Sequence, residues 1–277
     1  MAIELITKFA PYVDEIFTTE SKKSLITNQD FSWTGAHSIK VYKVSVSSMN
    51  DYNRENTQNG NWSRYGAVEG LEATTEEMIL KKDRSFTFII DKLDTDETAM
   101  QLQGASALAR QVRQVVVPEV DSHIYSVMCQ NAGIKATAAL TATNIYGEIV
   151  KATTALDNAE VPETGRSILV TPSVYQLMKQ SKEITMENDV GNDLRLKGVI
   201  SNLDGCNVIK VSANRLPEGF GFMMCHSVAT VAPTKLEDYK IHQDPPGISG
   251  TLVEGRICYD AFILENKANA VYCLSQK

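Results

Sequence analysis

Few residues of this sequence stand at spacings that could support metal chemistry. The four histidines, His37, His123, His226 and His242, are scattered, and only Glu119 and His123 share a helical face four residues apart. Such a pair supplies two ligands, whereas zinc sites need three or four ligands from the protein. An ion pair is therefore the better interpretation, and no metal site is predicted.

Catalytic patterns are equally sparse. Asp94, Asp96 and Glu97 could form an acid–base pair, but acidic side chains are common in the first turn of any helix. Gly219 and Gly221 form a GxG that lacks the third glycine and the strand-before-helix context of a dinucleotide loop, so a β-turn is expected. Neither GxSxG nor GxxxxGK[ST] occurs. The sequence predicts no catalytic and no cofactor-binding residue.

The composition is typical of an ordered globular chain of 277 residues, with 43% hydrophobic and 22% charged residues. Five dispersed cysteines, never spaced as CxxC, predict reduced thiols: Cys129, Cys206, Cys225, Cys258 and Cys273. A net charge of -7 without basic clusters argues against general nucleic-acid binding. No stretch reaches the ~18 apolar residues of a membrane span, and the first residues do not form a signal peptide. We expect a soluble protein that is not secreted.

The element best placed to organise the chain is a long amphipathic helix. Its apolar residues recur at steps of three and four: Leu108, Val112, Val116, Val120, Ile124 and Val127. Asp94 and Glu97 are spaced as a capping pair, so a continuous helix is expected over 96–128, ~50 Å long. Pro118 lacks an N–H and crowds the carbonyl of Gln114, which predicts a kink.

The other patterns predict an α+β fold. Strands are expected in HSIKVYKVSVS and RSFTFIID, and the forty polar, glycine-rich residues between them predict an extended hairpin. Helices are expected in PYVDEIFTTESKKS and NIYGEIVKATTAL, and a turn, a buried strand and a helix from Pro172 in VPETGRSILVTPSVYQLMKQ. Four more strands are expected in GCNVIKVS, GFGFMMCHS, KLEDYKI and GRICYDAFIL.

Several segments, in this order, resemble the major capsid proteins of tailed bacteriophages, which have the Hong Kong 97 capsid fold. They are DEIFTTES and FSWTGAHSIKVYKV near the N-terminus, DYNR and SRYG in the hairpin, and KKDRSFTFIID on its return. VVVPEVDSHIYS is similar to the spine helix of that family, and VPETGRSILVTPSVYQLM to its turn, strand and helix. The resemblance runs nearly end to end.

The resemblance implies a domain plan and a contact surface. The expected parts are an N-terminal arm (1–44), an extended loop (45–93), a peripheral domain with the spine helix (94–144), an axial domain (145–235) and the C-terminal strands of the peripheral domain (236–277). Contacts between subunits are expected at six residues of the arm and loop: Phe17, Trp33, Arg54, Trp62, Arg64 and Tyr65.

The function implied is structural, not enzymatic, and needs no cofactor. Hexamers and pentamers would self-assemble in the bacterial cytoplasm into an icosahedral virion shell around double-stranded DNA, without sequence-specific binding and without a membrane. Portal protein and a separately encoded scaffolding protein are the expected partners, and an untrimmed subunit is expected because the long N-terminal extension of some relatives is lacking. Self-crosslinking is not implied, since Lys81 and Lys82 have no identifiable acceptor.

Pro118 would let the spine helix bend as the shell changes curvature, and a fixed kink without mechanical use is the equal alternative. Two other functions remain open. An encapsulin-like nanocompartment would share the fold but enclose enzymes, and neighbouring genes would distinguish it. A cytoplasmic enzyme with an unrecognised site would appear as small particles under the microscope.

Overall fold

The computed structural model describes residues 20–28, 30–31, 38–52, 54, 63–66, 68, 70–97, 103–184 and 202–276. The side chains of Asp96 and Glu97 are outside this description. The chain divides into two units, which we call unit 1 (residues 1–32 and 81–277) and unit 2 (residues 33–80).

The centre of unit 1 is a mixed six-stranded sheet in the order β4-β13-β8-β5-β7-β6. Its strands are β4 (Ile134–Thr137), β5 (Arg166–Val170), β6 (Asn202–Leu203), β7 (Cys206–Lys210), β8 (Phe220–His226) and β13 (Val271–Ser275). β5 pairs in parallel with β7 and antiparallel with β8. Every residue of β5 is buried, as expected of a strand whose two faces are both covered.

Helices cover both faces of this sheet. They are α3 (Val117–Gln130), α4 (Ile145–Asn158) and α5 (Pro172–Gln180). On one face Ile149 of α4 belongs to the same buried cluster as Ile168 of β5. On the other face Ile124 of α3 shares a cluster with Leu169 of β5. Because successive strand residues point to opposite faces, Ile168 and Leu169 serve two separate cores.

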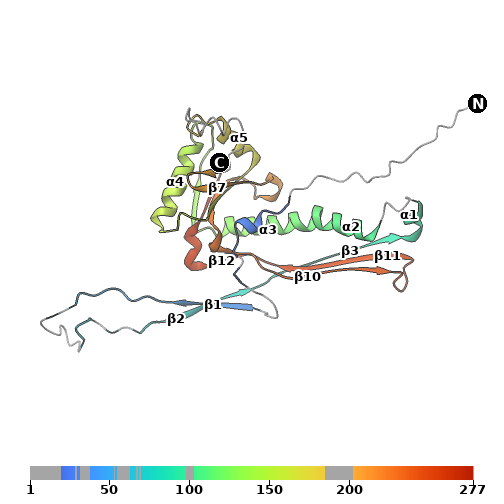
Figure 1. Ribbon diagram of the computed structural model, residues 1–277, viewed down its shortest axis with the longest axis horizontal. Coiled ribbons are helices and arrows are strands. Elements are labelled where there is room, and N and C mark those ends of the chain that lie inside the picture. The colour runs from blue at the N-terminus through green and yellow to red at the C-terminus, as the bar shows by residue number, and fades with distance from the viewer. Residues whose placement is uncertain are drawn as a thin grey trace, which may run out of the picture. The chain divides into compact units, whose positions relative to one another are not determined.

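A second sheet of unit 1 contains three antiparallel strands in the order β10-β11-β3. They are β3 (Lys82–Asp91), β10 (Thr234–Gln243) and β11 (Gly250–Tyr259). The long helix formed by α2 (Gly104–Gln111) and α3 runs alongside them (Figure 1). Phe86, Phe88 and Ile90 lie on one face, as predicted. Phe86 stacks on Tyr239 across Gly255, where any Cβ atom would collide with the Phe86 ring. The glycine therefore permits the stack.

The long amphipathic helix is confirmed over 104–130. It consists of α2 (Gly104–Gln111), a π-helical turn (Val112–Val116) and α3. Val116, Val120 and Ile124 of the predicted stripe are buried. In the π turn the Val117 N–H bonds to the carbonyl of Val112, five residues back. A proline inside a helix clashes with the carbonyl four residues before it, and the wider turn directly before Pro118 relieves this crowding.

The predicted start of this helix is wrong. Gln103 has extended backbone angles (φ -92°, ψ 138°), so the helix begins at Gly104 and is about 40 Å long. Asp94 lies inside a separate short helix, α1 (Lys92–Glu97). The carboxylate of Asp91 accepts the Leu93 N–H at 2.9 Å and so caps α1 in place of the predicted pair.

The described part of the N-terminal segment is docked on unit 1. Residues 23–25 form a single 3₁₀ turn and residues 20–22 are irregular, while the rest of the helix predicted over 11–24 lies outside the described residues. Ile26 is completely buried in the cluster that contains α3. The Ser21 hydroxyl donates to the Asp121 carboxylate of α3 at 2.6 Å.

The core of unit 2 is a two-stranded antiparallel ribbon of β1 (Ser38–Val44) and β2 (Ala73–Ile79), in which Tyr42 pairs with Thr75. This antiparallel pairing is that of a hairpin, but its strands are not the two predicted ones, because RSFTFIID (β3) pairs with β11 in unit 1. β2 was not predicted, because its sequence ATTEEMI is mostly polar and has no clear apolar alternation.

Candidate functional site

Glu119 and His123, the pair with helical spacing, each bond to another side chain of unit 1, Glu119 in an ion pair and His123 in a hydrogen bond. The Arg84 Nε donates to Glu119 Oε1 at 2.7 Å, and the Tyr259 hydroxyl lies 3.4 Å from the same oxygen. His123 Nε2 lies 2.8 Å from Asp260 Oδ1. Burial, together with the Glu119 charge, raises the pKa of Tyr259 to about 12. Within the described ranges no three His, Cys, Asp or Glu side chains gather as a metal site.

Asp260 is a buried carboxylate whose two oxygens are both engaged. Its Oδ2 accepts the Lys81 backbone N–H at 2.9 Å, and its Oδ1 accepts the Ala261 N–H at 2.9 Å. Together with His123, these donors compensate for the loss of water around a charge that is 6% exposed. The Asp260 carboxylate thus holds two stretches of backbone, at Lys81 and at Ala261.

The GxG glycines stand in a turn and a strand, as predicted. Gly219 has a left-handed φ of +70° in a turn closed by the Phe220 N–H and the Pro217 carbonyl. Gly221 lies in β8, where a Cβ would press on Leu274 of β13. A strand, not a helix, follows the turn, so the phosphate-binding context of a dinucleotide loop is missing.

All five cysteines are free thiols. Burial raises the pKa of Cys225 to about 12 and that of Cys206 to about 11. Thiols with raised pKa values carry little thiolate at neutral pH and are poor nucleophiles.

In the described part of the chain no helix is both long enough and apolar enough to cross a membrane.

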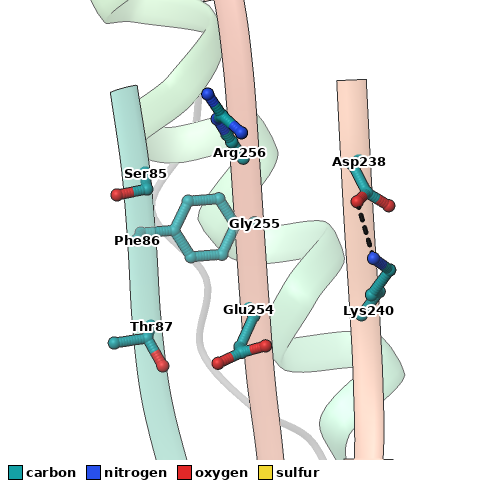
Figure 2. A pocket seen from close by; sticks show the side chains of 8 residues that line it. All are labelled: Ser85, Phe86, Thr87, Asp238, Lys240, Glu254, Gly255 and Arg256. Atoms are coloured by element: carbon teal, nitrogen blue, oxygen red, sulfur yellow. Dashed lines mark ion pairs between the residues drawn. The ribbon is translucent and has the colours of Figure 1, made fainter. Parts of the chain in front are cut away.

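The outer face of the three-stranded sheet has a shallow depression of about 370 Å³. Figure 2 shows its lining: Ser85, Phe86, Thr87, Asp238, Lys240, Glu254, Gly255 and Arg256. Arg256 donates to Asp83 at 2.9 and 2.5 Å, which holds the pKa of Asp83 below its usual range. Lys240 pairs with Asp238 at 2.8 Å. Alternating charges neutralise one another here, so the depression has no field of one sign that could bind an ionic substrate.

Unit 2 exposes large apolar side chains. Among its described residues, those at least half exposed are Tyr42, Val44, Val46, Met49, Tyr52, Tyr65, Val68 and Leu71. Val46 and Met49 are 92% and 99% exposed, so nearly all of their side-chain surface is open to water. This exposed apolar surface gains free energy when another surface covers it. Sequence inspection missed it because these residues are dispersed among polar ones.

The residues predicted to contact other subunits are only partly described. Arg54 and Arg64 are exposed. Tyr65 is 76% exposed and packs edge-on against Tyr52, with 4.9 Å between ring centroids. Phe17, Trp33 and Trp62 lie outside the described residues. All six contacts remain predictions.

Comparison with known proteins gives matches among solved structures alone, since no family model and no curated protein matches the chain. A structure from Mycobacterium phage Che8 is similar with a TM-score of 0.78 and 16% identity, covering 99% of this chain and 96% of that chain. The capsid structure of cyanophage P-SCSP1u has a TM-score of 0.77 and 15% identity, covering 98% and 93%. A virus-like particle from Pyrococcus furiosus has a TM-score of 0.59 and 11% identity, covering 93% of each chain. The chain therefore has the α+β capsid fold of the Hong Kong 97 type.

Proposed function

We propose that this protein is the major capsid protein of a tailed bacteriophage and self-assembles as hexamers and pentamers into an icosahedral shell around the genome. The observation that carries the proposal is the apolar surface of unit 2 on a chain with a capsid fold. A two-stranded ribbon is marginally stable alone, and exposed apolar side chains gain free energy only when another surface covers them. A second subunit supplies that surface.

In this proposal the domain plan follows the sequence: arm (1–44), extended loop (45–93), peripheral domain (94–144 and 236–277) and axial domain (145–235). Unit 2 overlaps most of the loop, which supports that assignment. Arg54, Arg64 and Tyr65 contact a neighbouring subunit, together with Phe17, Trp33 and Trp62. These are aromatic and arginine side chains, the types enriched at interfaces.

The shell acts in the virion and has no enzymatic role. It assembles in the host cytoplasm on a separate scaffolding protein and incorporates a portal protein. The shell encloses DNA without binding it tightly, in keeping with a net charge of -7.

An encapsulin-like compartment is the second candidate, favoured by the similarity to the virus-like particle from Pyrococcus furiosus. Its TM-score of 0.59, against 0.77 for the cyanophage capsid, makes it the weaker one. Terminase, portal and scaffolding genes beside this gene support the phage capsid, whereas a lone shell gene beside a peroxidase or ferritin-like enzyme supports the compartment.

Negative-stain microscopy of the purified full chain tests the shared claim. Capsomers or closed shells are expected. The claim would be contradicted if every assembly condition gave small monodisperse particles and nothing larger. Co-expression with the scaffolding protein is the necessary second condition, because a scaffold-dependent subunit need not close shells alone.

The spine helix has a mechanical role in the same proposal. The π turn before Pro118 is a local irregularity at which the helix can bend as the shell changes curvature. Comparing subunits before and after shell expansion tests this role. An unchanged angle between α2 and α3 would leave a fixed irregularity without mechanical use.

A further inference from the structure

Both chain segments that lead to unit 2 are held by one small part of unit 1. Its centre is the two-stranded antiparallel pair of β9 (Thr230–Val231) and β12 (Phe262–Ile263). Backbone hydrogen bonds close the pair at each end, from the Asp260 N–H to the Pro233 carbonyl at 3.3 Å and from the Leu264 N–H to the Ala229 carbonyl at 3.1 Å. We call residues 229–233 and 260–264 the anchor.

The segment before unit 2 is bound to the β9 side of the anchor. Asn28 forms a parallel bridge with Val231, and its N–H donates to the Thr230 carbonyl at 2.7 Å. Two residues earlier, the fully buried Ile26 holds the same segment in the core. The backbone is therefore fixed up to Asn28, shortly before unit 2 begins at residue 33.

The segment after unit 2 is bound to the other side of the anchor. Unit 2 ends at residue 80, and Lys81 is the first residue of unit 1 on this side. Its N–H donates to Asp260 Oδ2 at 2.9 Å. The second carboxylate oxygen is held by the Ala261 N–H and by His123 of α3 at 2.8 Å. Asp260 thus connects three parts of unit 1 by hydrogen bonds: the backbone at Lys81, the anchor and the spine helix.

We propose that Asp260 is a positioning residue for the hairpin, whose carboxylate fixes the backbone at Lys81 so that both legs of unit 2 leave from one rigid anchor. The proposal rests on the proposed assembly function, because a hairpin that must meet a neighbouring subunit needs fixed legs. Only a carboxylate provides acceptors on both sides at this position. An asparagine has one acceptor oxygen, which satisfies more donors on the side of Ala261 and His123, so its NH₂ group turns toward the Lys81 N–H and that hydrogen bond is lost.

The test is amide hydrogen exchange on the full-length, unassembled Asp260→Asn variant. Exchange at Lys81 should rise about tenfold, the effect of one lost hydrogen bond, and amides of β1 and β2 should also exchange faster. Amides of β5 and β8 should be unchanged, which separates local release from global unfolding. Asp238→Asn is the matched control, since it removes the same charge from the exposed strand β10 and should alter none of these amides.

Lys81→Pro removes the same hydrogen bond from the donor side and leaves Asp260 intact, so it serves if Asp260→Asn does not fold. It should accelerate exchange in β1 and β2 as well. Unchanged exchange in unit 2 for both variants would overturn the proposal, and so would normal shells built from a variant with a released hairpin. If the unaltered protein never forms particles, the proposed function fails, but the exchange result still decides whether Asp260 fixes the hairpin base.

Discussion

Units 1 and 2 differ in how much of their apolar side-chain surface they bury. Unit 1 buries two clusters on opposite faces of its central sheet, and residues such as Ile124, Ile149 and Phe222 are almost or completely inaccessible to water. Unit 2 has two paired strands and leaves Val46 and Met49 almost fully exposed. Burial of apolar surface contributes roughly 25 cal/mol per Å², so in the proposed shell unit 2 gains stability when a neighbouring subunit covers these side chains.

The ion pairs do not divide the two units in this way. In unit 1, Arg215 and Asp121 form an ion pair at 2.8 Å with side chains 7% and 1% exposed, and Arg166, 2% exposed, pairs with Asp157 at 2.7 Å. In unit 2, Lys43 and Glu76 form a longer ion pair, at 3.4 Å, with side chains 19% and 14% exposed. The contrast between the units lies in the apolar side chains, so changes in the core of unit 1 should alter folding, while changes at the exposed side chains of unit 2 should alter assembly.

The largest expected effect is that of a charge on the buried stripe of the spine helix. Val116→Asp places a carboxylate at a position 8% exposed and should lower the free energy of unfolding by about 3 kcal/mol or leave the protein insoluble. Val115→Asp is the matched control, because Val115 is the neighbour of Val116 on the same helix and is 47% exposed. Urea titration of both variants measures the difference. Equal stabilities would show that the stripe is not part of the core.

A smaller loss is expected when the buried ion pair is broken. Asp121→Asn removes the negative charge that lies 2.8 Å from the buried Arg215 guanidinium and should cost about 3 kcal/mol or somewhat less, since Ser21 can still bond to the amide. Asp83→Asn breaks the exposed pair with Arg256 and should not measurably change the unfolding curve. Should both variants lose the same stability, burial would not be what distinguishes the two ion pairs.

The main elements of unit 1 could be predicted because local sequence encodes them. The stripe of the spine helix and the Thr171–Pro172 start of α5 are of this kind, and the Thr171 hydroxyl does accept the Val174 N–H at 3.2 Å. The prediction of where the spine helix begins was wrong, because Gln103 has an extended backbone and α1 is a separate helix with its own cap. No local pattern signals that break.

The site could not be predicted, because its contacts join residues far apart in the chain. Arg84 meets Glu119, and Asp260 meets both His123 and the backbone of Lys81, which lie on different elements. Sequence spacing revealed Glu119 and His123 as neighbours but not their partners. The docking of Ile26 was missed for the same reason, since one buried residue in a polar segment has no periodicity.

Alkaline pH should weaken unit 1 by a lesser amount. Burial raises the pKa of Tyr259 from 10 to about 12, so the folded state holds this proton more tightly than the unfolded chain. That contribution is fully present below pH 10 and is lost as pH rises toward 12. Tyr259→Phe should flatten this part of the stability profile, measured by urea unfolding between pH 8 and 11. Tyr42→Phe, in unit 2 and 75% exposed, is the control and should leave the slope unchanged.

The smallest effect on folding, and the sharpest test of the comparison, is expected from removing residues 54–66 of unit 2. The ribbon of β1 and β2 remains, and none of the described residues among 54–66 belongs to a buried cluster of unit 1, so the unfolding free energy should change by less than about 0.5 kcal/mol. Closed shells should be absent by negative-stain microscopy, because the variant lacks Arg54, Arg64 and Tyr65. Replacing the same thirteen positions by glycine and serine keeps the loop length and removes only the side chains. If that replacement restores shells, reach matters and the predicted contacts do not; if the deletion itself still assembles, unit 2 is not the surface that joins subunits.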